Sequence, residues 1–135
     1  MMSKIQATDI SLLLLRLAFG GLMVINHGWG KLEKLLAAGP IKFGDPLGIG
    51  AEASLSLAVF AEVVCAILLV AGLFTRWAAI PSLITMLVAA FIVHWGDSIR
   101  DKESALLFGT AYLVLLLMGP GRYSLDGWWE RRRMI

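Results

Sequence analysis

Residues 53–74 read ASLSLAVFAEVVCAILLVAGLF, a run with a single charged side chain, Glu62. An α-helix needs about 20 mostly apolar residues to cross the hydrocarbon core of a bilayer, and this run is long enough. The run is continuous, so it lacks the alternation of apolar and polar residues that marks a membrane β-strand. It therefore predicts a transmembrane helix and an all-α fold.

Three further apolar runs flank this one. The first contains Arg16, the third contains Pro81 and ends near His94, and the last is ALLFGTAYLVLLLM at its heart. We predict an integral membrane antiparallel four-helix bundle that forms a single domain, residues 1–135. Its helices are expected at residues 10–27, 53–74, 77–95 and 103–119.

The composition agrees with a membrane protein and excludes several other classes. Of the residues, 59% are apolar and 16% charged, whereas soluble domains are about 45–50% apolar and about a quarter charged. A net charge of +2 without a basic stripe gives no reason to expect a nucleic-acid partner. The single cysteine, Cys65, rules out an intramolecular disulfide and a cysteine-based metal cluster. The lipid bilayer is the expected partner.

The connection between the first two helices, residues 28–52, is the only long one. Its middle reads AAGPIKFGDPLGIG, and so many glycines and prolines predict a loop rather than a regular helix. Long ordered loops are often functional, so this one is a candidate lid or partner surface.

An even number of helices places both termini on one side of the membrane. Lys4, Arg76, Arg122 and the Arg131–Arg133 cluster fall on that side. The other side carries five: Lys31, Lys34, Lys42, Arg100 and Lys102. Cytoplasmic segments carry an excess of Lys and Arg, and the Arg131–Arg133 cluster just beyond the last helix favours cytoplasmic termini.

Two charged residues lie inside the predicted membrane region, Arg16 in the first helix and Glu62 in the second. Such charges are costly in lipid and face the bundle interior with partners. The two helices are consecutive and antiparallel, so the sequence predicts an Arg16–Glu62 ion pair. The alternative is that Arg16 extends to the headgroups and Glu62 is a neutral, hydrogen-bonded acid.

Helical phase extends this polar face. His27 follows Arg16 by eleven residues, which leaves them about 20° apart around the axis. Lys31 lies about 60° from Arg16 if the helix persists, and His94 ends the third helix at the same level. The hypothesis is one polar site that opens toward the outer face. Its candidate ligand-binding residues are Arg16, Asn26, His27, Lys31, Glu62 and His94.

The depth of these residues leaves two alternatives open. Arg16 and His27 are separated by about 16 Å along the helix axis. The alternative to one site is therefore two: an ion pair on the cytoplasmic side and a histidine cluster on the outer side. Each histidine could also make interfacial hydrogen bonds without chemistry.

The two histidines set the range of chemistry. Neutral imidazoles can relay protons or hydrogen-bond a quinone carbonyl. Two histidines without a third ligand do not make a zinc site, and bis-histidine haem requires facing rings. We therefore predict no metal site, disfavour haem, keep quinone as a candidate ligand, and assign no catalytic residue.

A series of short motifs resembles a known family. It comprises Arg16, His27-Gly28-x-x-Lys31, Glu62, Leu68-Leu69-x-x-Gly72-Leu73-x-Thr75-Arg76 and Gly119-Pro120-Gly121-Arg122-Tyr123-Ser124-Leu125-Asp126. Their order and spacing resemble the DoxX family of small bacterial four-helix membrane proteins. The resemblance implies the bacterial inner membrane, and it implies association with redox chemistry, since some relatives are linked to quinone-dependent thiosulfate oxidation or to quinone resistance.

Two interpretations of function follow. In the first, the chain is a redox-associated accessory that binds a quinone or similar amphiphile in its polar interior, as a homo-oligomer or in a larger membrane complex. It has no cysteine pair or cofactor motif that would make it a redox enzyme alone, although it could be a subunit of a quinone-linked oxidoreductase. In the second, it is a non-enzymatic structural subunit or a small transporter.

Overall fold

The computed structural model describes all 135 residues, and its regular secondary structure is entirely helical, with no β-strand. The all-α prediction is confirmed. Three helices are long and apolar enough to cross a membrane: Lys4–Leu36, Ala51–Ala71 and Thr75–Val93. The fourth long helix, Ile99–Met118, begins with a charged turn and is not among these three, so the predicted fourth span stays a prediction. The antiparallel arrangement in a membrane also stays a prediction.

The three long helices each combine α-helical and wider π-helical segments. The first consists of α1 (Lys4–Leu15), η1 (Arg16–Gly20), α2 (Gly21–Met23), η2 (Val24–Gly28) and α3 (Trp29–Leu36). The second consists of α4 (Ala51–Val59), η3 (Phe60–Cys65) and α5 (Ala66–Ala71), and the third of α6 (Thr75–Val88) and η4 (Ala89–Val93). They are followed by α7 (Ile99–Met118) and α8 (Leu125–Arg133).

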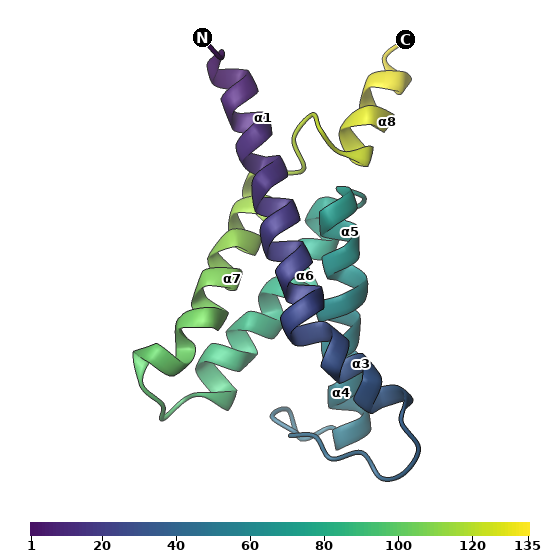
Figure 1. Cartoon of the computed structure of the whole chain (residues 1–135), viewed down its shortest axis with the longest axis vertical. Coiled ribbons are helices and arrows are strands. Elements are labelled where there is room, and N and C mark those ends of the chain that lie inside the picture. The colour runs from purple at the N-terminus through teal and green to yellow at the C-terminus, as the bar shows by residue number, and fades with distance from the viewer.

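In Figure 1 the chain runs down through α1 and α3, returns up through α4 and α5, descends through α6 and rises through α7. Both termini therefore lie at one end of the molecule, which we call the terminal end. The opposite end, which we call the loop end, holds the 37–50 segment and the turn between η4 and α7.

Local signals fix where the helices begin. Ser3 forms a capping box with Gln6, in which each side chain accepts from the other residue's backbone N–H, so the first helix starts at Lys4, six residues earlier than predicted. At the start of α7, the carboxylate of Asp101 accepts the backbone N–H of Ser98.

The first helix is also longer than predicted at its other end. Residues 28–36 were expected in the loop, yet they continue the helix to Leu36. Leu32 and Leu35 pack against a small buried cluster formed by Leu55, Val59 and Val63, because an amphipathic helix is stabilised by burying its apolar face. The connecting loop is therefore only residues 37–50.

The main core lies between the first helix, α5, α6 and α7. It includes Met23, Leu69, Tyr112 and Leu115, all almost fully buried. The hydroxyl of Tyr112 donates to the carbonyl of Phe19 (3.2 Å), which ties α7 to the first helix. α6 packs along most of α7.

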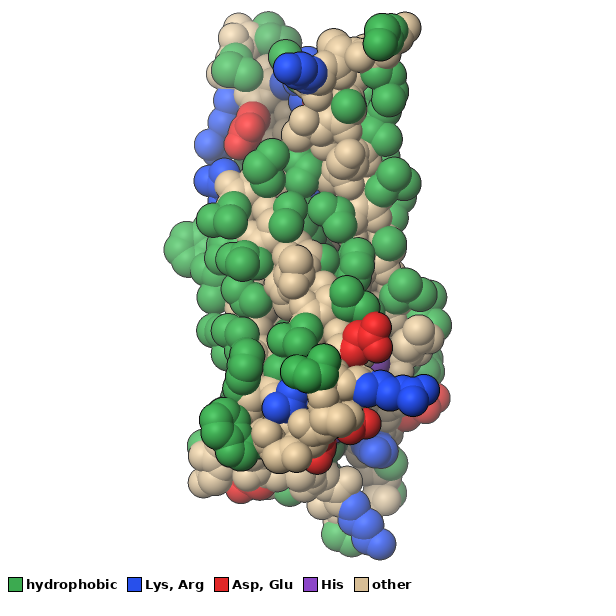
Figure 2. Space-filling model, turned by 90° about the vertical axis from the view of Figure 1, so that its left-hand side faces the viewer, with side chains coloured by type: hydrophobic (Ala, Val, Ile, Leu, Met, Phe, Trp, Pro, Cys, Tyr) green, Lys and Arg blue, Asp and Glu red, His purple; other side chains and the backbone are tan.

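The outside of the bundle is apolar around its middle. Many leucine, isoleucine and phenylalanine side chains are exposed there, and charged side chains gather toward the two ends (Figure 2). This distribution is the one a bilayer requires, with hydrocarbon around the middle and water at both ends.

Candidate functional site

A cavity of about 710 Å³ lies toward the loop end. Its walls come from η2 and α3, from α4 and η3, from α6 and η4, and from the first turns of α7. Most lining residues are apolar. The polar ones are His27, Lys31, Ser54, Glu62, Thr85, His94, Asp101 and Ser104. Four of the six residues predicted for the polar site thus line one cavity.

An ion pair lies in this cavity. The Nζ atom of Lys31 is 2.5 Å from Oε2 of Glu62. The Glu62 side chain is 4% exposed and the Lys31 side chain 27% exposed, so the carboxylate is the buried member and the ammonium is reached from the cavity. An ammonium has three N–H donors, and this pair uses one of them.

Gly28 allows the helices that carry the pair to approach closely. It is buried, and a Cβ placed there would lie 2.5 Å from the carbonyl oxygen of Glu62 and 2.9 Å from its carbonyl carbon. Backbone atoms cannot move aside as a flexible side chain can, so only glycine fits. Because Lys31 follows Gly28 by one helical turn, this contact brings the ammonium to the carboxylate.

Each π-helical segment contains or directly precedes a candidate residue. η1 begins with Arg16, η2 contains His27, η3 contains Glu62, and η4 ends one residue before His94. A π-helical turn inserts an extra residue into the α-helical register and often occurs at functional sites. The insertion also redirects every side chain that follows it.

The two histidines are held differently at the cavity wall. The His94 Nδ1 atom is 2.7 Å from Oδ2 of Asp97, whereas the His27 ring meets the ring of Phe108 edge to face, with centroids 5.5 Å apart. Asn26 is exposed and does not line the cavity. No three His, Cys, Asp or Glu side chains come together closely enough to hold a metal ion.

The 37–50 loop covers part of the cavity. Phe43, Pro46 and Leu47 line it, and Phe43 also packs against the Leu55 cluster. Asp45 anchors the loop to α4, since its carboxylate accepts from the backbone N–H groups of Ile49 (2.9 Å) and Gly50 (2.8 Å) and from Ser54 Oγ (2.8 Å). The hydrogen bonds from Gly50 and Ser54 hold the pKa of Asp45 below its ordinary value.

The predicted Arg16–Glu62 ion pair does not form. Arg16 is 1% exposed, but its guanidinium donates to the carbonyls of Val70 (3.2 Å) and Tyr123 at the terminal end. Val70 is near the end of its helix, where carbonyls lack helical partners and the helix dipole is negative. It also lies about 12 Å along the helix from Glu62. Arg16 therefore binds nearer acceptors, and Glu62 binds Lys31.

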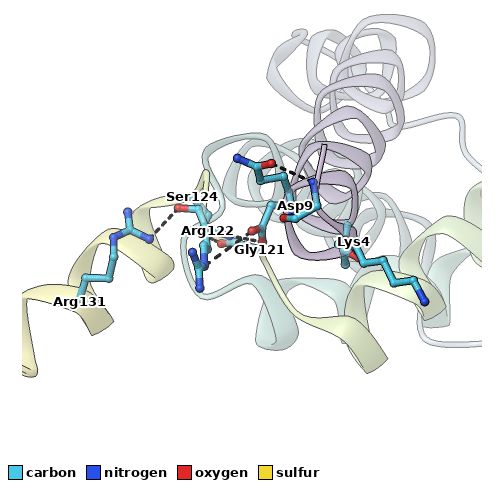
Figure 3. Close-up of polar contacts among 9 residues, drawn as sticks. Lys4, Asp9, Gly121, Arg122, Ser124 and Arg131 are labelled. Carbon is cyan, nitrogen blue, oxygen red and sulfur yellow. Dashed lines mark hydrogen bonds and ion pairs between the residues drawn. The ribbon is translucent and has the colours of Figure 1, made fainter. Parts of the chain in front are cut away.

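The C-terminal tail is fastened at this same end. The Asp126 carboxylate accepts from the backbone N–H groups of Phe74 and Thr75, both at 2.9 Å, and so caps the start of α6. The backbone N–H of Asp126 in turn donates to the carbonyl of Gly72 (2.9 Å). Asp9 accepts the backbone N–H of Arg122 (2.9 Å), as the close-up in Figure 3 shows.

The sequence of the chain matches a known protein family. It matches the DoxX family model over residues 11–95. The chain belongs to the DoxX family. The resemblance drawn from the sequence motifs is confirmed.

Two uncharacterized proteins are similar in sequence to this DoxX chain. One, an uncharacterized protein of Haemophilus influenzae, is 32% identical over 111 residues, which cover 77% of this chain and 80% of the relative. The other, an uncharacterized membrane protein of Mycobacterium tuberculosis, is 33% identical over 124 residues, which cover 78% of this chain and 74% of the relative. No solved structure matches the chain.

The DoxX motifs divide between the two ends of the molecule. The His27-Gly28-x-x-Lys31 motif and Glu62 build the loop-end cavity. Arg16 and the two motifs around Gly72 and Asp126 build the fastening at the terminal end. Sequence reasoning missed the capping roles of Asp9, Asp45 and Asp126. A signal was present for Asp45, which stands in a glycine- and proline-rich stretch where aspartates commonly bind backbone N–H groups.

Proposed function

We propose that this DoxX protein binds a quinone or a similar amphiphile in the loop-end cavity and acts as a redox-associated accessory of the membrane. The observation that carries the proposal is an apolar cavity of about 710 Å³ with the Lys31–Glu62 ion pair in its wall. Sites for small molecules typically occupy about 300–1,000 Å³ and combine an apolar lining with a few polar groups.

The position of the cavity supports a ligand that arrives through the lipid. Leu57, Phe60 and Ile84 line it, and each also contributes to the exposed apolar surface of the bundle. A hydrophobic molecule dissolved in the bilayer would thus meet the cavity from the side. A strongly polar solute would have to pass the 37–50 loop instead.

The polar groups suit the head of such a ligand. Lys31 has ammonium N–H groups beyond the one that binds Glu62, and these can donate to a quinone carbonyl. His27 and His94 lie on the wall at the same end and can each donate or accept one hydrogen bond. In this proposal Glu62 is a positioning residue, which orients Lys31.

A binding experiment tests the proposal. Decylubiquinone is added to the full chain in detergent, and the bound fraction is measured by native mass spectrometry. We expect saturable binding by the wild type and a loss of about tenfold or more in Lys31→Met, because a hydrogen bond to a charged donor contributes about 1.5–3 kcal/mol.

Asn26→Ala is the matched control. Asn26 lies on the same helix beside His27 but is exposed outside the cavity, so its replacement should leave binding unchanged. Wild-type binding that does not saturate, or equal binding by Lys31→Met and Asn26→Ala, would overturn the proposal.

We also infer that the protein is a bacterial inner-membrane protein whose fourth span is α7, in an antiparallel bundle with cytoplasmic termini. A membrane-spanning α7 is supported by the difference between its two faces, which are both apolar but differ in burial. Tyr112 and Leu115 are fully buried, whereas Leu107, Leu113 and Leu117 are exposed where a bilayer would cover them. The arginines of the terminal end favour the cytoplasmic side.

A second candidate function is a structural subunit, homo-oligomeric or in a larger complex, or a small transporter. Arg16 favours it, since a buried guanidinium that binds carbonyls of two distant segments holds the fold together without a ligand. Loss of the isolated monomer from native mass spectra, with no bound amphiphile in any preparation, would support this function over the first.

A further inference from the structure

A second pocket, of about 1010 Å³, opens at the terminal end. It lies between the turn that joins α5 to α6, the segment that follows α7, and α8. Four arginines line it: Arg76, Arg122, Arg131 and Arg133. It is separate from the loop-end cavity, so nothing in the proposed function depends on it.

Three acidic side chains line this pocket, Asp9, Asp126 and Glu130. Glu130 is exposed, and the other two are occupied by the protein itself. Both carboxylate oxygens of Asp126 accept backbone N–H groups. Asp9 accepts the backbone N–H of Arg122 and lies 3.7 Å from its Nε atom. These carboxylates serve as helix and turn caps, and they do not pair with Arg76 or Arg133.

Two of the arginines have most of their donors free. Arg76 makes one long hydrogen bond, 3.4 Å to the carbonyl of Leu117. Arg133 donates no hydrogen bond to the protein and stacks over the ring of Trp129, 5.4 Å from its centroid. Arg131, by contrast, is held by the carbonyl of Arg122 (3.0 Å), and Figure 3 shows it reaching from α8 to that turn.

A buried hydroxyl in the same wall also lacks a partner. Thr75 lines the pocket and is 1% exposed, yet its Oγ1 atom makes no hydrogen bond. Buried polar groups are nearly always hydrogen-bonded, so an unpartnered one requires an explanation. A polar ligand bound in this pocket would provide the missing hydrogen-bond partner of the Thr75 hydroxyl.

The remaining lining residues indicate the depth of the pocket in the membrane. Trp77 and Trp129 line it and are 76% and 50% exposed, and tryptophan is enriched at the headgroup level of bilayers. Phe74 and Met118, both exposed, provide an apolar wall. The pocket thus has cationic donors beside apolar surface at the height where lipid headgroups lie.

We propose that this pocket binds the headgroup of an anionic phospholipid, with Arg76 and Arg133 on its phosphate. Guanidinium groups bind phosphate oxygens through paired N–H donors. The apolar wall would meet the upper part of the acyl chains, which a free phosphate ion lacks.

The test compares lipids that differ only in the headgroup. The full chain in detergent is titrated with phosphatidylglycerol or with phosphatidylcholine of the same acyl chains, and bound lipid is counted by native mass spectrometry. We expect the wild type to prefer phosphatidylglycerol. Arg76→Gln/Arg133→Gln should weaken that binding about thirtyfold, which corresponds to about 1 kcal/mol for each arginine near an anionic headgroup.

Arg100→Gln/Lys102→Gln, at the loop end, is the matched control and should bind phosphatidylglycerol like the wild type. If the double terminal-end variant does not fold, Arg133→Gln alone carries the test with a loss of about fivefold, since Arg133 makes no hydrogen bond that folding could require. Equal affinity for the two lipids, equal losses at the two ends, or full displacement by excess inorganic phosphate would overturn the proposal. The quinone experiment is unaffected by these outcomes.

Discussion

Lys31 and Glu62 form an ion pair in the wall of an apolar cavity, with Nζ 2.5 Å from Oε2. The pair joins the first helix to the second and lies one helical turn from Gly28, where the two backbones touch. Glu62 is more deeply buried than Lys31, so removal of the lysine and removal of the carboxylate should have different consequences for stability.

Removal of the lysine alone should be more harmful than removal of both charges. Lys31→Met leaves a buried carboxylate without its partner and should reduce the free energy of unfolding by about 3 kcal/mol, whereas Lys31→Met/Glu62→Gln should recover most of that loss. Thermal unfolding in detergent, followed by circular dichroism, measures the order of the melting temperatures. Lys34→Met is the control, because Lys34 is exposed on the same helix. A Lys31→Met variant that melts like Lys34→Met would show that the pair does not stabilise the fold.

Two nearby glycines should respond in opposite directions to the same substitution. Gly28→Ala places a Cβ against the Glu62 backbone and should destabilise the protein by about 1–3 kcal/mol through overpacking. Gly30→Ala meets open space and should stabilise the helix by up to about 1 kcal/mol. The same melting experiment compares them, and a Gly28→Ala variant as stable as Gly30→Ala would contradict the close approach.

The anchoring of the 37–50 loop should depend on pH through Asp45. Its pKa is lowered in the folded state, so its hydrogen bonds contribute in full above the unfolded pKa, near 3.8, and are lost as the pH falls through the lower folded value. Hydrogen-exchange protection of the loop, corrected for intrinsic rates, should therefore be constant at neutral pH and fall in strong acid. Asp45→Asn should reduce the protection of this loop already at pH 7. Asp97→Asn, in the turn between η4 and α7, should leave the protection of the 37–50 loop unchanged. Protection in Asp45→Asn equal to the wild type would exclude the anchor.

The membrane topology can be read from cysteine labelling in a Cys65→Ser background. Lys4→Cys and Arg133→Cys should react with an impermeant maleimide only after the cells are opened, and Asp97→Cys should react from outside. Labelling of positions 4 and 133 in intact cells would reverse the orientation. Labelling of positions 97 and 133 from the same side would remove α7 from the set of spans.

Length and hydropathy are local properties, so the sequence predicted the three long apolar helices, although the first of them extends beyond its predicted bounds at both ends. The sequence did not predict the partners of Arg16. The helical phase that places His27 above Arg16 assumes an unbroken α-helix, yet Arg16 lies in η1 and His27 lies in η2. Each π-helical insertion turns the side chains that follow it by about 100° around the helix axis. The two residues therefore do not share one face of the helix: Arg16 is buried and His27 is exposed.

The same limit applies to the tail. The carbonyl of Tyr123 accepts from Arg16, and three residues later the backbone N–H of Asp126 donates to the carbonyl of Gly72 in the turn after α5. Such a contact depends on backbone positions more than a hundred residues apart in the chain. Lys31 was predicted for the polar site, but its pairing with Glu62 was not. That pairing requires the first helix to continue beyond Gly28, whereas the glycine-rich composition of the following residues favoured a loop.

The fastening of the C-terminal tail has a consequence for how the protein is made. A chain leaves the ribosome from its N-terminus, and its early segments organise first. Arg16 therefore enters the membrane long before Tyr123 has been synthesised, and one of its two acceptors is missing for that whole interval. A nascent chain that stops short of Tyr123 lacks that acceptor, so its buried guanidinium keeps only the hydrogen bond to the carbonyl of Val70.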